Sequence, residues 1–387
     1  MKQILTVFFL FSFSTTFSQT LTPDYFYVKT KDSLPFLKYG LGEDRLGGAK
    51  MTFLDSNIVL KVTDSSRDDY KVQLSQFHNA WIEKEKVAKT IAMEEKQHLT
   101  SSWNVYGDSL YDYVIVSLDQ KLPYRSEMKI NPSRIVVDIF GAVSNTNWIT
   151  QLSSAKAIKN AWYEQPEDDV MRVIIELKHS QNWGYRIYYS ENNKLTIRIK
   201  RQPRILNLSN LKVAVDAGHG GENVGATGIT SKIKEKDYTL LIAKELEKQL
   251  IKKKAKVVMT RTKDTTLSMF ERIQYLEQQN PDLLISIHLN SASKDTISGV
   301  STYYRYIGFR PLSQAILKSM LQLGLHEFGN VGSFNFSLSG PTDYPNCLVE
   351  VAFLSNKKDE KKILDPKFRR EAAIKIVEGI EDFLKKL

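Results

Sequence analysis

The sequence has almost no cysteine, since Cys347 is the only one among 387 residues. A lone cysteine cannot form a disulfide within the chain, so burial of apolar side chains must stabilise the fold. The same shortage excludes a structural zinc site built from cysteine thiolates. Histidines are also few, six in all, and each one that follows a predicted strand is a candidate functional residue.

Long apolar runs are absent after the first residues. Residues 4–13 are almost wholly apolar, follow Lys2 and precede small residues, a pattern typical of an export signal at residues 1–18. The run is shorter than the roughly 20 residues that a membrane-spanning helix needs. The alternative is a buried N-terminal core segment. We therefore expect an exported protein with no transmembrane segment after signal cleavage.

Acidic residues are outnumbered, which gives a net charge of +10. Such an excess favours an anionic partner, whether nucleic acid, a membrane surface or an acidic polymer. The sequence lacks a basic cluster interleaved with stacking aromatics, so a nucleic-acid partner is not expected. The 42% of hydrophobic residues is that of a soluble globular protein, and the length predicts two or three domains.

Two small β-rich domains are predicted in the N-terminal half. Residues 20–92 contain short alternating runs separated by glycine-containing turns, and they resemble bacterial SH3-like modules. The lysine-rich residues 83–97 are expected to form a solvated helix or a linker.

The second β-rich domain, at residues 100–203, contains an internal repeat. Residues 114–118 and 134–139 have later counterparts at 173–177 and 194–199, which predicts a symmetric β-sandwich. The pattern resembles AMIN domains, the localisation domains that often precede cell-wall amidases.

Residues 208–387 alternate short apolar strands with longer helical patterns. This alternation predicts an α/β domain with a mostly parallel sheet and helices on both faces. The expected strands cover 211–215, 256–260, 283–287 and 347–353, and the expected helices cover 236–254, 269–279, 312–323 and 366 to the end.

Two histidines follow predicted strands of this domain. His219 lies in the glycine-rich stretch 215–221, and His288 comes directly after the strand at 283–287. Ligand sites in open α/β sheets lie at the carboxyl ends of strands. The stretch lacks the residue spacing of phosphate-binding and dinucleotide-binding loops. A hydrogen-bonded structural histidine remains the alternative for each position taken alone.

Two carboxylates complete a candidate site. Glu350 lies within an apolar strand, where an ionised group is costly unless it is paired or near a metal. Glu235 opens a helix, and its alternative role is to complement the helix dipole. Two histidines and one carboxylate leave a fourth metal position for water, as in catalytic zinc sites. Glu222 and Glu327 are weaker ligand candidates.

The order of these motifs resembles the catalytic domain of zinc-dependent N-acetylmuramoyl-L-alanine amidases (the amidase_3 family). The resemblance rests on the segments 216–221, 234–237, 260–261, 286–290, 299–304 and 349–356. It implies that His219, Glu235 and His288 bind Zn²⁺ and that Glu350 is the catalytic carboxylate.

The resemblance also implies supporting roles for Arg261 and Asn290. The implied reaction is hydrolysis of the amide between N-acetylmuramic acid and L-alanine in peptidoglycan. Two positions depart from the family pattern, because Asn223 replaces an aspartate and Ala352 replaces a glycine.

Two other functions remain open: a zinc peptidase that cuts within the stem peptide, and an inactive wall-binding protein. Some members of the family carry a long helical insertion that covers the zinc. Only modest sequence lies between residues 304 and 345, so we expect no such insertion and activity without a partner protein. The β-rich domains are expected to bind peptidoglycan or other cell-envelope proteins. The expected location is the periplasm or the cell wall.

Overall fold

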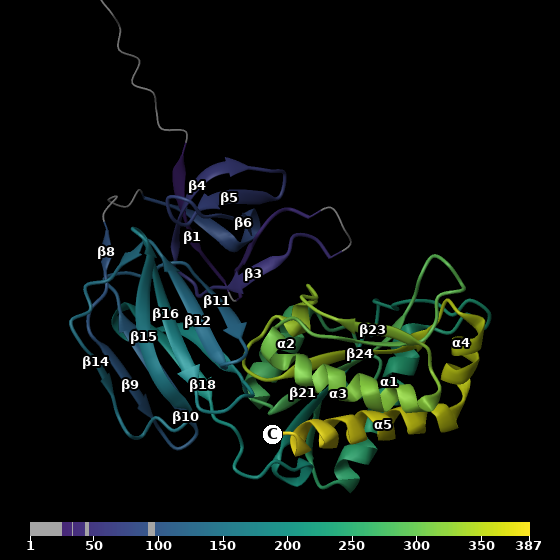
Figure 1. Ribbon diagram of the computed structural model, residues 1–387. Coiled ribbons are helices and arrows are strands. Elements are labelled where there is room, and N and C mark those ends of the chain that lie inside the picture. Colours follow the sequence, from purple (N-terminus) through teal and green to yellow (C-terminus); the bar gives the residue numbers. More distant parts are fainter. Residues whose placement is uncertain (1–24, 33, 43–45, 92–96) are drawn as a thin grey trace, which may run out of the picture.

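A computed structural model describes residues 25–32, 34–42, 46–91 and 97–387. Three sheet-based units follow one another along the chain and pack together (Figure 1). The export signal predicted at residues 1–18 lies outside the described residues. Among the helices described, none combines the length and apolarity needed to cross a membrane.

The N-terminal unit is one antiparallel sheet with the strand order β3-β2-β6-β5-β4-β1-β7. Its strands are β1 (Phe26–Thr30), β2 (Phe36–Lys38), β3 (Lys50–Phe53), β4 (Val59–Ser65), β5 (Asp69–Gln73), β6 (Asn79–Glu83) and β7 (Val87–Thr90).

The prediction of a helix or linker at 83–97 is wrong for the part that forms β7. This strand pairs with β1, and its Val87 side chain is buried in the core. Lys89 points to the other side and lies over the ring of Phe26. The lysines of this segment therefore mark the solvent face of an edge strand, where charged residues are common.

The second unit is a β-sandwich made of a five-stranded sheet, β14-β9-β10-β18-β17, and a four-stranded sheet, β11-β12-β16-β15. A short parallel pair, β8 with β13, lies beside them. The strands are β8 (His98–Leu99), β9 (Trp103–Gly107), β10 (Tyr111–Ser117), β11 (Tyr124–Lys129), β12 (Arg134–Phe140), β13 (Ala142–Val143), β14 (Ile149–Gln151), β15 (Ile158–Glu167), β16 (Val170–Leu177), β17 (Tyr185–Ser190) and β18 (Lys194–Lys200).

The internal repeat is visible in this sandwich. The first copy supplies the hairpin β9–β10 to one sheet and β11–β12 to the other, and the second copy supplies β17–β18 and β15–β16 to the same two sheets. The copies meet where β10 pairs with β18 and β12 pairs with β16. Each sheet is therefore built from one hairpin of each copy.

The C-terminal unit contains a six-stranded sheet with the order β20-β19-β21-β24-β22-β23. Neighbouring strands are parallel, except that β22 runs antiparallel to β24. The strands are β19 (Lys212–Ala217), β20 (Lys256–Met259), β21 (Leu283–Asn290), β22 (Val300–Tyr303), β23 (Glu327–Val331) and β24 (Asn346–Phe353).

Helices cover both faces of this sheet. Alternate residues of β19 and β21 pack in one cluster with α1, α3 and α5, while Ala214 and Leu284 face α2 in another. The helices are α1 (Glu235–Lys252), α2 (Met269–Gln279), α3 (Arg310–Met320), α4 (Lys357–Leu364) and α5 (Pro366–Lys385). Of the helix expected at 312–323, the α-helical part is α3, which packs against α5.

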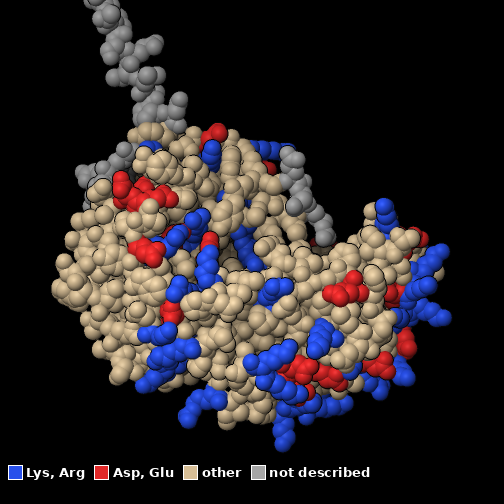
Figure 2. All heavy atoms as spheres, in the orientation of Figure 1, with Lys and Arg blue, Asp and Glu red and all other residues tan. Residues whose placement is uncertain are grey.

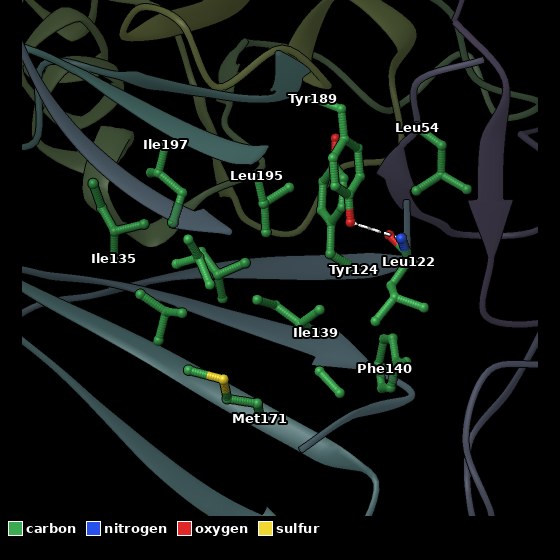
Figure 3. Close-up of a cluster of buried hydrophobic side chains, with 14 of the residues drawn as sticks. Leu54, Leu122, Tyr124, Ile135, Ile139, Phe140, Met171, Tyr189, Leu195 and Ile197 are labelled. Carbon is green, nitrogen blue, oxygen red and sulfur yellow. Dashed lines mark hydrogen bonds between the residues drawn. The ribbon is translucent and has the colours of Figure 1, made fainter. Parts of the chain in front are cut away.

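The three units share buried surfaces. Leu54 of the N-terminal unit packs in the sandwich core beside Leu122, Tyr124 and Tyr189 (Figure 3), and Phe309 of the C-terminal unit joins the same cluster. Tyr189 donates a hydrogen bond from its hydroxyl to the Leu122 carbonyl at 2.7 Å. On the face in Figure 2, Lys and Arg side chains are interspersed with Asp and Glu rather than gathered in one patch.

Candidate metal centre

Three side chains from separate elements meet at one end of the C-terminal sheet. His219 follows β19, Glu235 is the first residue of α1, and His288 lies near the end of β21. One ligand atom from each lies within 4.8 Å of the others. Glu235 Oε1 is 3.1 Å from His219 Nε2 and 3.1 Å from His288 Nδ1. The sequence thus identified the three members of a group that could hold a metal ion.

The His219 side chain is oriented by its own loop. His219 has a left-handed backbone conformation, with φ of 61°. Its Nδ1 lies 2.8 Å from Asn223 Oδ1, which also accepts a hydrogen bond from the Gly225 amide. Because this oxygen can only accept, His219 Nδ1 donates to it, and a metal bound at Nε2 would replace the proton that Nε2 shares with Glu235. Asn223, noted from the sequence only as a departure from the family pattern, fixes the tautomer that metal binding requires.

Glycine is required where the His288 ring packs against the loop. A Cβ on Gly218 would overlap the His288 imidazole, and a Cβ on Gly225 would lie 2.8 Å from His219 Cδ2. On the other side of His288, the Phe336 ring lies edge-on with its centroid 5.5 Å away. The imidazole is therefore held between backbone and an aromatic side chain.

The Glu235 carboxylate is buried and ionised. Burial alone would raise its pKa, but hydrogen bonds with the two imidazoles hold the pKa of Glu235 far below its usual value. Backbone amides of Ala226 and Leu289 also donate to this carboxylate, at 2.8 and 3.0 Å. For His219, burial lowers the pKa, but the hydrogen bond to Glu235, the charge of Glu235 and the hydrogen bond to Asn223 together raise the pKa above the ordinary value.

Two buried arginines donate hydrogen bonds to backbone carbonyls of the loop that carries His219. Arg261 donates to the carbonyls of Ala217 and Gly218, both at 2.9 Å. Arg272 donates to the His219 carbonyl at 2.5 Å and pairs with Asp216, also at 2.5 Å. Burial would raise the pKa of Asp216, but the Arg272 charge holds it below its usual value. Arg272 was missed in the sequence because an arginine on a helix gives no sign that it is buried.

Glu350 and Asn290 lie in the same cleft as the three ligand candidates. Glu350 is half-buried on β24, directly opposite His288 in the parallel ladder. Residues opposite each other in a ladder point to the same face, so the carboxylate lies beside the imidazole. Asn290 donates to the Tyr303 hydroxyl at 3.3 Å. The cleft encloses about 880 Å³.

The weaker candidates lie apart from the ligand group. Glu222 lines the cleft but is not a member of the group, and Glu327 is exposed on β23. His78 and His98 pair with Glu167 and Asp119 in the β-rich units.

The donor set fits a divalent metal such as zinc. Two imidazoles and one carboxylate are a recurring catalytic zinc ligand set, and each ring here has a nitrogen facing the shared oxygen of Glu235. The orientation of His219 by Asn223 is the outer-shell arrangement that metal-binding histidines usually have.

Known proteins resemble two parts of the chain. Residues 213–382 match the family model for N-acetylmuramoyl-L-alanine amidase, and residues 103–201 match the AMIN domain. A "Probable cell wall amidase LytH" of Staphylococcus saprophyticus is 31% identical over 193 residues, which is 50% of this chain and 65% of that protein. The Staphylococcus aureus protein of the same name is 33% identical over 170 residues, 44% of this chain and 57% of that protein.

The chain thus spans less than two thirds of either relative. Among solved structures, the catalytic domain of CwlV, an N-acetylmuramoyl-L-alanine amidase from Bacillus (Paenibacillus) polymyxa var. colistinus, is 33% identical. The match covers 45% of this chain and 98% of that domain, with a TM-score of 0.44. By these matches, residues 213–382 resemble the N-acetylmuramoyl-L-alanine amidase family and residues 103–201 resemble AMIN domains, so we call the two units the amidase domain and the AMIN sandwich.

Proposed function

We propose that this chain hydrolyses the amide bond between N-acetylmuramic acid and L-alanine in peptidoglycan, with zinc as its cofactor. The observation that carries the proposal is that His219, Glu235 and His288 form a possible metal site and line a cleft that Glu350 also lines. The family of residues 213–382 supports the choice of bond.

His219, Glu235 and His288 would hold the zinc ion. Zinc bound there would lower the pKa of a water molecule and polarise the scissile carbonyl. The chain's own contribution is a rigid ligand set, since the loop carbonyls are held by Arg261 and Arg272. Such preorganisation reduces the cost of reaching the reactive geometry.

Glu350 is the proposed general base and acid. Its position opposite His288 puts a carboxylate beside the ligand group without making it a member of that group. Glu350 would accept a proton from the attacking water and deliver it to the nitrogen of L-alanine as the amide breaks. Asn290, at the edge of the cleft, is positioned to orient the substrate amide.

The AMIN domain and the cell-wall amidase relatives support a location outside the cytoplasm, in the periplasm or at the cell wall. We propose that the N-terminal sheet is an SH3-like domain and that both β-rich units bind peptidoglycan or other cell-envelope proteins. The proposed boundaries are residues 1–18 for the signal, 20–92 and 100–203 for the β-rich domains, and 208–387 for the catalytic domain.

The experiment is a digestion of purified peptidoglycan by residues 19–387, with and without a chelator, followed by mass spectrometry. We expect free stem peptides and intact muramic acid, loss of cleavage with chelator, and recovery with added zinc. New ends within the stem peptide would instead identify a peptidase. Intact peptidoglycan in the presence of bound zinc would contradict the proposal of a self-sufficient amidase.

A further inference from the structure

A loop of the N-terminal sheet reaches the cleft that contains the metal centre. Leu46, in the connection between β2 and β3, lines this cleft together with residues of the amidase domain. In Figure 1, β3 is the strand of the N-terminal sheet that lies next to the amidase domain. The cleft wall is therefore built from two units that are far apart in the sequence.

This loop is fixed to the amidase domain through Asn335. The Asn335 side chain donates to the carbonyls of Leu46 at 3.3 Å and Gly48 at 3.0 Å, and its oxygen accepts from the Lys50 amide at 3.1 Å. Arg305 adds a hydrogen bond to the Lys50 carbonyl. Three hydrogen bonds from one side chain set the position of the loop more firmly than apolar contact alone would.

The residues on both sides of Asn335 form an aromatic surface in the cleft. The rings of Phe334 and Phe336 are stacked, with centroids 6.3 Å apart and planes 29° apart. Phe336 also contacts His288, and Met269 lines the same cleft. We name Leu46, Met269, Phe334 and Phe336 the apolar shelf. Phe336 connects the shelf to the metal-ligand candidate His288. A group bound on the shelf would therefore lie next to the scissile amide, and it would be either the sugar or the peptide that this amide joins.

The charge of the cleft distinguishes the two possible occupants of the apolar shelf, the stem peptide and the N-acetylmuramoyl sugar. Among the described residues that line the cleft, none is Lys or Arg, whereas Glu222, Glu235 and Glu350 are acidic. Zn²⁺ would offset the charge of Glu235, but no basic residue of this lining would pair with the carboxylates of a stem peptide. A pyranose ring is neutral and presents a face of C–H groups, which suits an apolar aromatic surface.

We propose that the apolar shelf is a subsite for the N-acetylmuramoyl sugar ring and that the N-terminal sheet completes it with Leu46. The proposal rests on the amidase function proposed above. It assigns the N-terminal sheet a direct part in substrate binding, in addition to any role in localisation.

The test measures binding without turnover. A zinc-loaded full-length Glu350→Gln protein is titrated calorimetrically with N-acetylglucosaminyl-N-acetylmuramic acid capped as its methylamide, and separately with a free stem peptide. We expect Leu46→Ala and Phe334→Ala, each in this background, to weaken disaccharide binding about ten-fold and to change peptide binding less than about two-fold. Asn335→Ala, which releases the loop, is expected to act like Leu46→Ala.

Leu41→Ala is the matched control, because Leu41 is an exposed leucine in the same β2–β3 connection that does not line the cleft. Leu46→Met keeps the apolar contact and is expected to bind the disaccharide like the unsubstituted protein. Zinc content and circular dichroism show whether each variant is folded.

Weakened peptide binding with unchanged disaccharide binding would overturn the proposal and assign the shelf to the peptide. Unchanged binding of both probes would also overturn it. The digestion of peptidoglycan tests the amidase function separately, so a protein that binds the disaccharide but cleaves nothing contradicts that function and leaves the subsite standing.

Discussion

Asn223 lies behind His219 and decides which ring nitrogen carries the proton. Replacing Asn223 with alanine removes the acceptor and lets the ring adopt either tautomer and rotate. We expect Asn223→Ala to lower zinc affinity about 10-fold, the lower end of the effect typical of outer-shell partners. A competition titration with a chromogenic chelator measures this, and Asn223→Asp, which retains the acceptor, is expected to keep the affinity. Equal affinities for all three proteins would exclude the role.

Glu350 is placed to move a proton without binding the metal. We expect Glu350→Gln to reduce turnover of peptidoglycan fragments about 10³-fold, because the amide cannot accept the proton of the attacking water. Zinc content, measured by atomic emission, is expected to stay at the unsubstituted level. Loss of the metal from this variant would identify Glu350 as a ligand instead.

The site residues that could be predicted from the sequence are those that lie near the ends of strands and helices. His219, His288 and Glu235 could be found because each lies within two residues of the end or start of a regular element. Arg272 and Asn223 could not be assigned, since their roles depend on loop closure that brings them against His219. Leu46 could not be predicted either, because it reaches the cleft only through packing of the N-terminal sheet on the amidase domain.

At the scale of elements, Asp138 ties together the strands of the four-stranded sheet. On β12 it lies opposite Arg125 of β11 and Arg172 of β16, with ion pairs of 2.9 and 2.7 Å. Burial alone would raise the pKa of Asp138, but the two arginines hold it below its ordinary value. The pairs therefore stabilise the fold fully above the unfolded-state pKa of about 3.9, and this contribution is lost as pH falls through the lower folded-state pKa.

We expect Asp138→Asn to reduce the free energy of unfolding by about 2 kcal/mol at pH 7. The difference between the two proteins should shrink below about pH 4, because Asp138 becomes protonated first in the unfolded state and, at lower pH, in the folded state as well. Urea unfolding from pH 7 to pH 2.5 measures both quantities. A constant difference across this range would show that the ion pairs do not stabilise the sheet.

Elements with strong apolar patterns were predicted well, and short or polar ones were not. The stripe of leucines predicted α1, and apolar runs predicted β19, β21 and β24. Each of these elements lies within a few residues of its predicted position. No apolar pattern indicated α4, because only its last two residues are apolar. β22 and β23 are short, and they join the sheet through neighbours far along the chain: β22 pairs with β24, and β23 pairs with β22.

At the scale of the whole molecule, the N-terminal sheet and the AMIN sandwich share one core. We expect them to unfold in a single calorimetric transition. Leu54→Ala removes a buried side chain from this core and should lower that transition, at a cost of about 2–5 kcal/mol. Hydrogen exchange should then speed up in β12 and β16 of the sandwich as well as in the N-terminal strands.

The matched substitution is Leu250→Ala, because Leu250 of α1 is fully buried in the separate core of the amidase domain. It is expected to lower the transition of the amidase domain and to leave exchange in the sandwich unchanged. Two separate transitions for the N-terminal sheet and the sandwich, with Leu54→Ala acting on one only, would contradict a common core.

Because each sheet of the sandwich combines hairpins from both copies of the repeat, the order of synthesis limits how early the sandwich can fold. In the first copy, β10 pairs with β18 of the second copy, and β12 pairs with β16 of the second copy. A nascent chain can thus form separate hairpins early, but the four-stranded sheet is complete only once β16, which ends at Leu177, has left the ribosome, and the five-stranded sheet only once β18, which ends at Lys200, has done so. The sandwich is therefore completed when β18, its last strand, pairs with β10 near its start. Only about a dozen residues separate β18 from Lys212, where the amidase sheet begins.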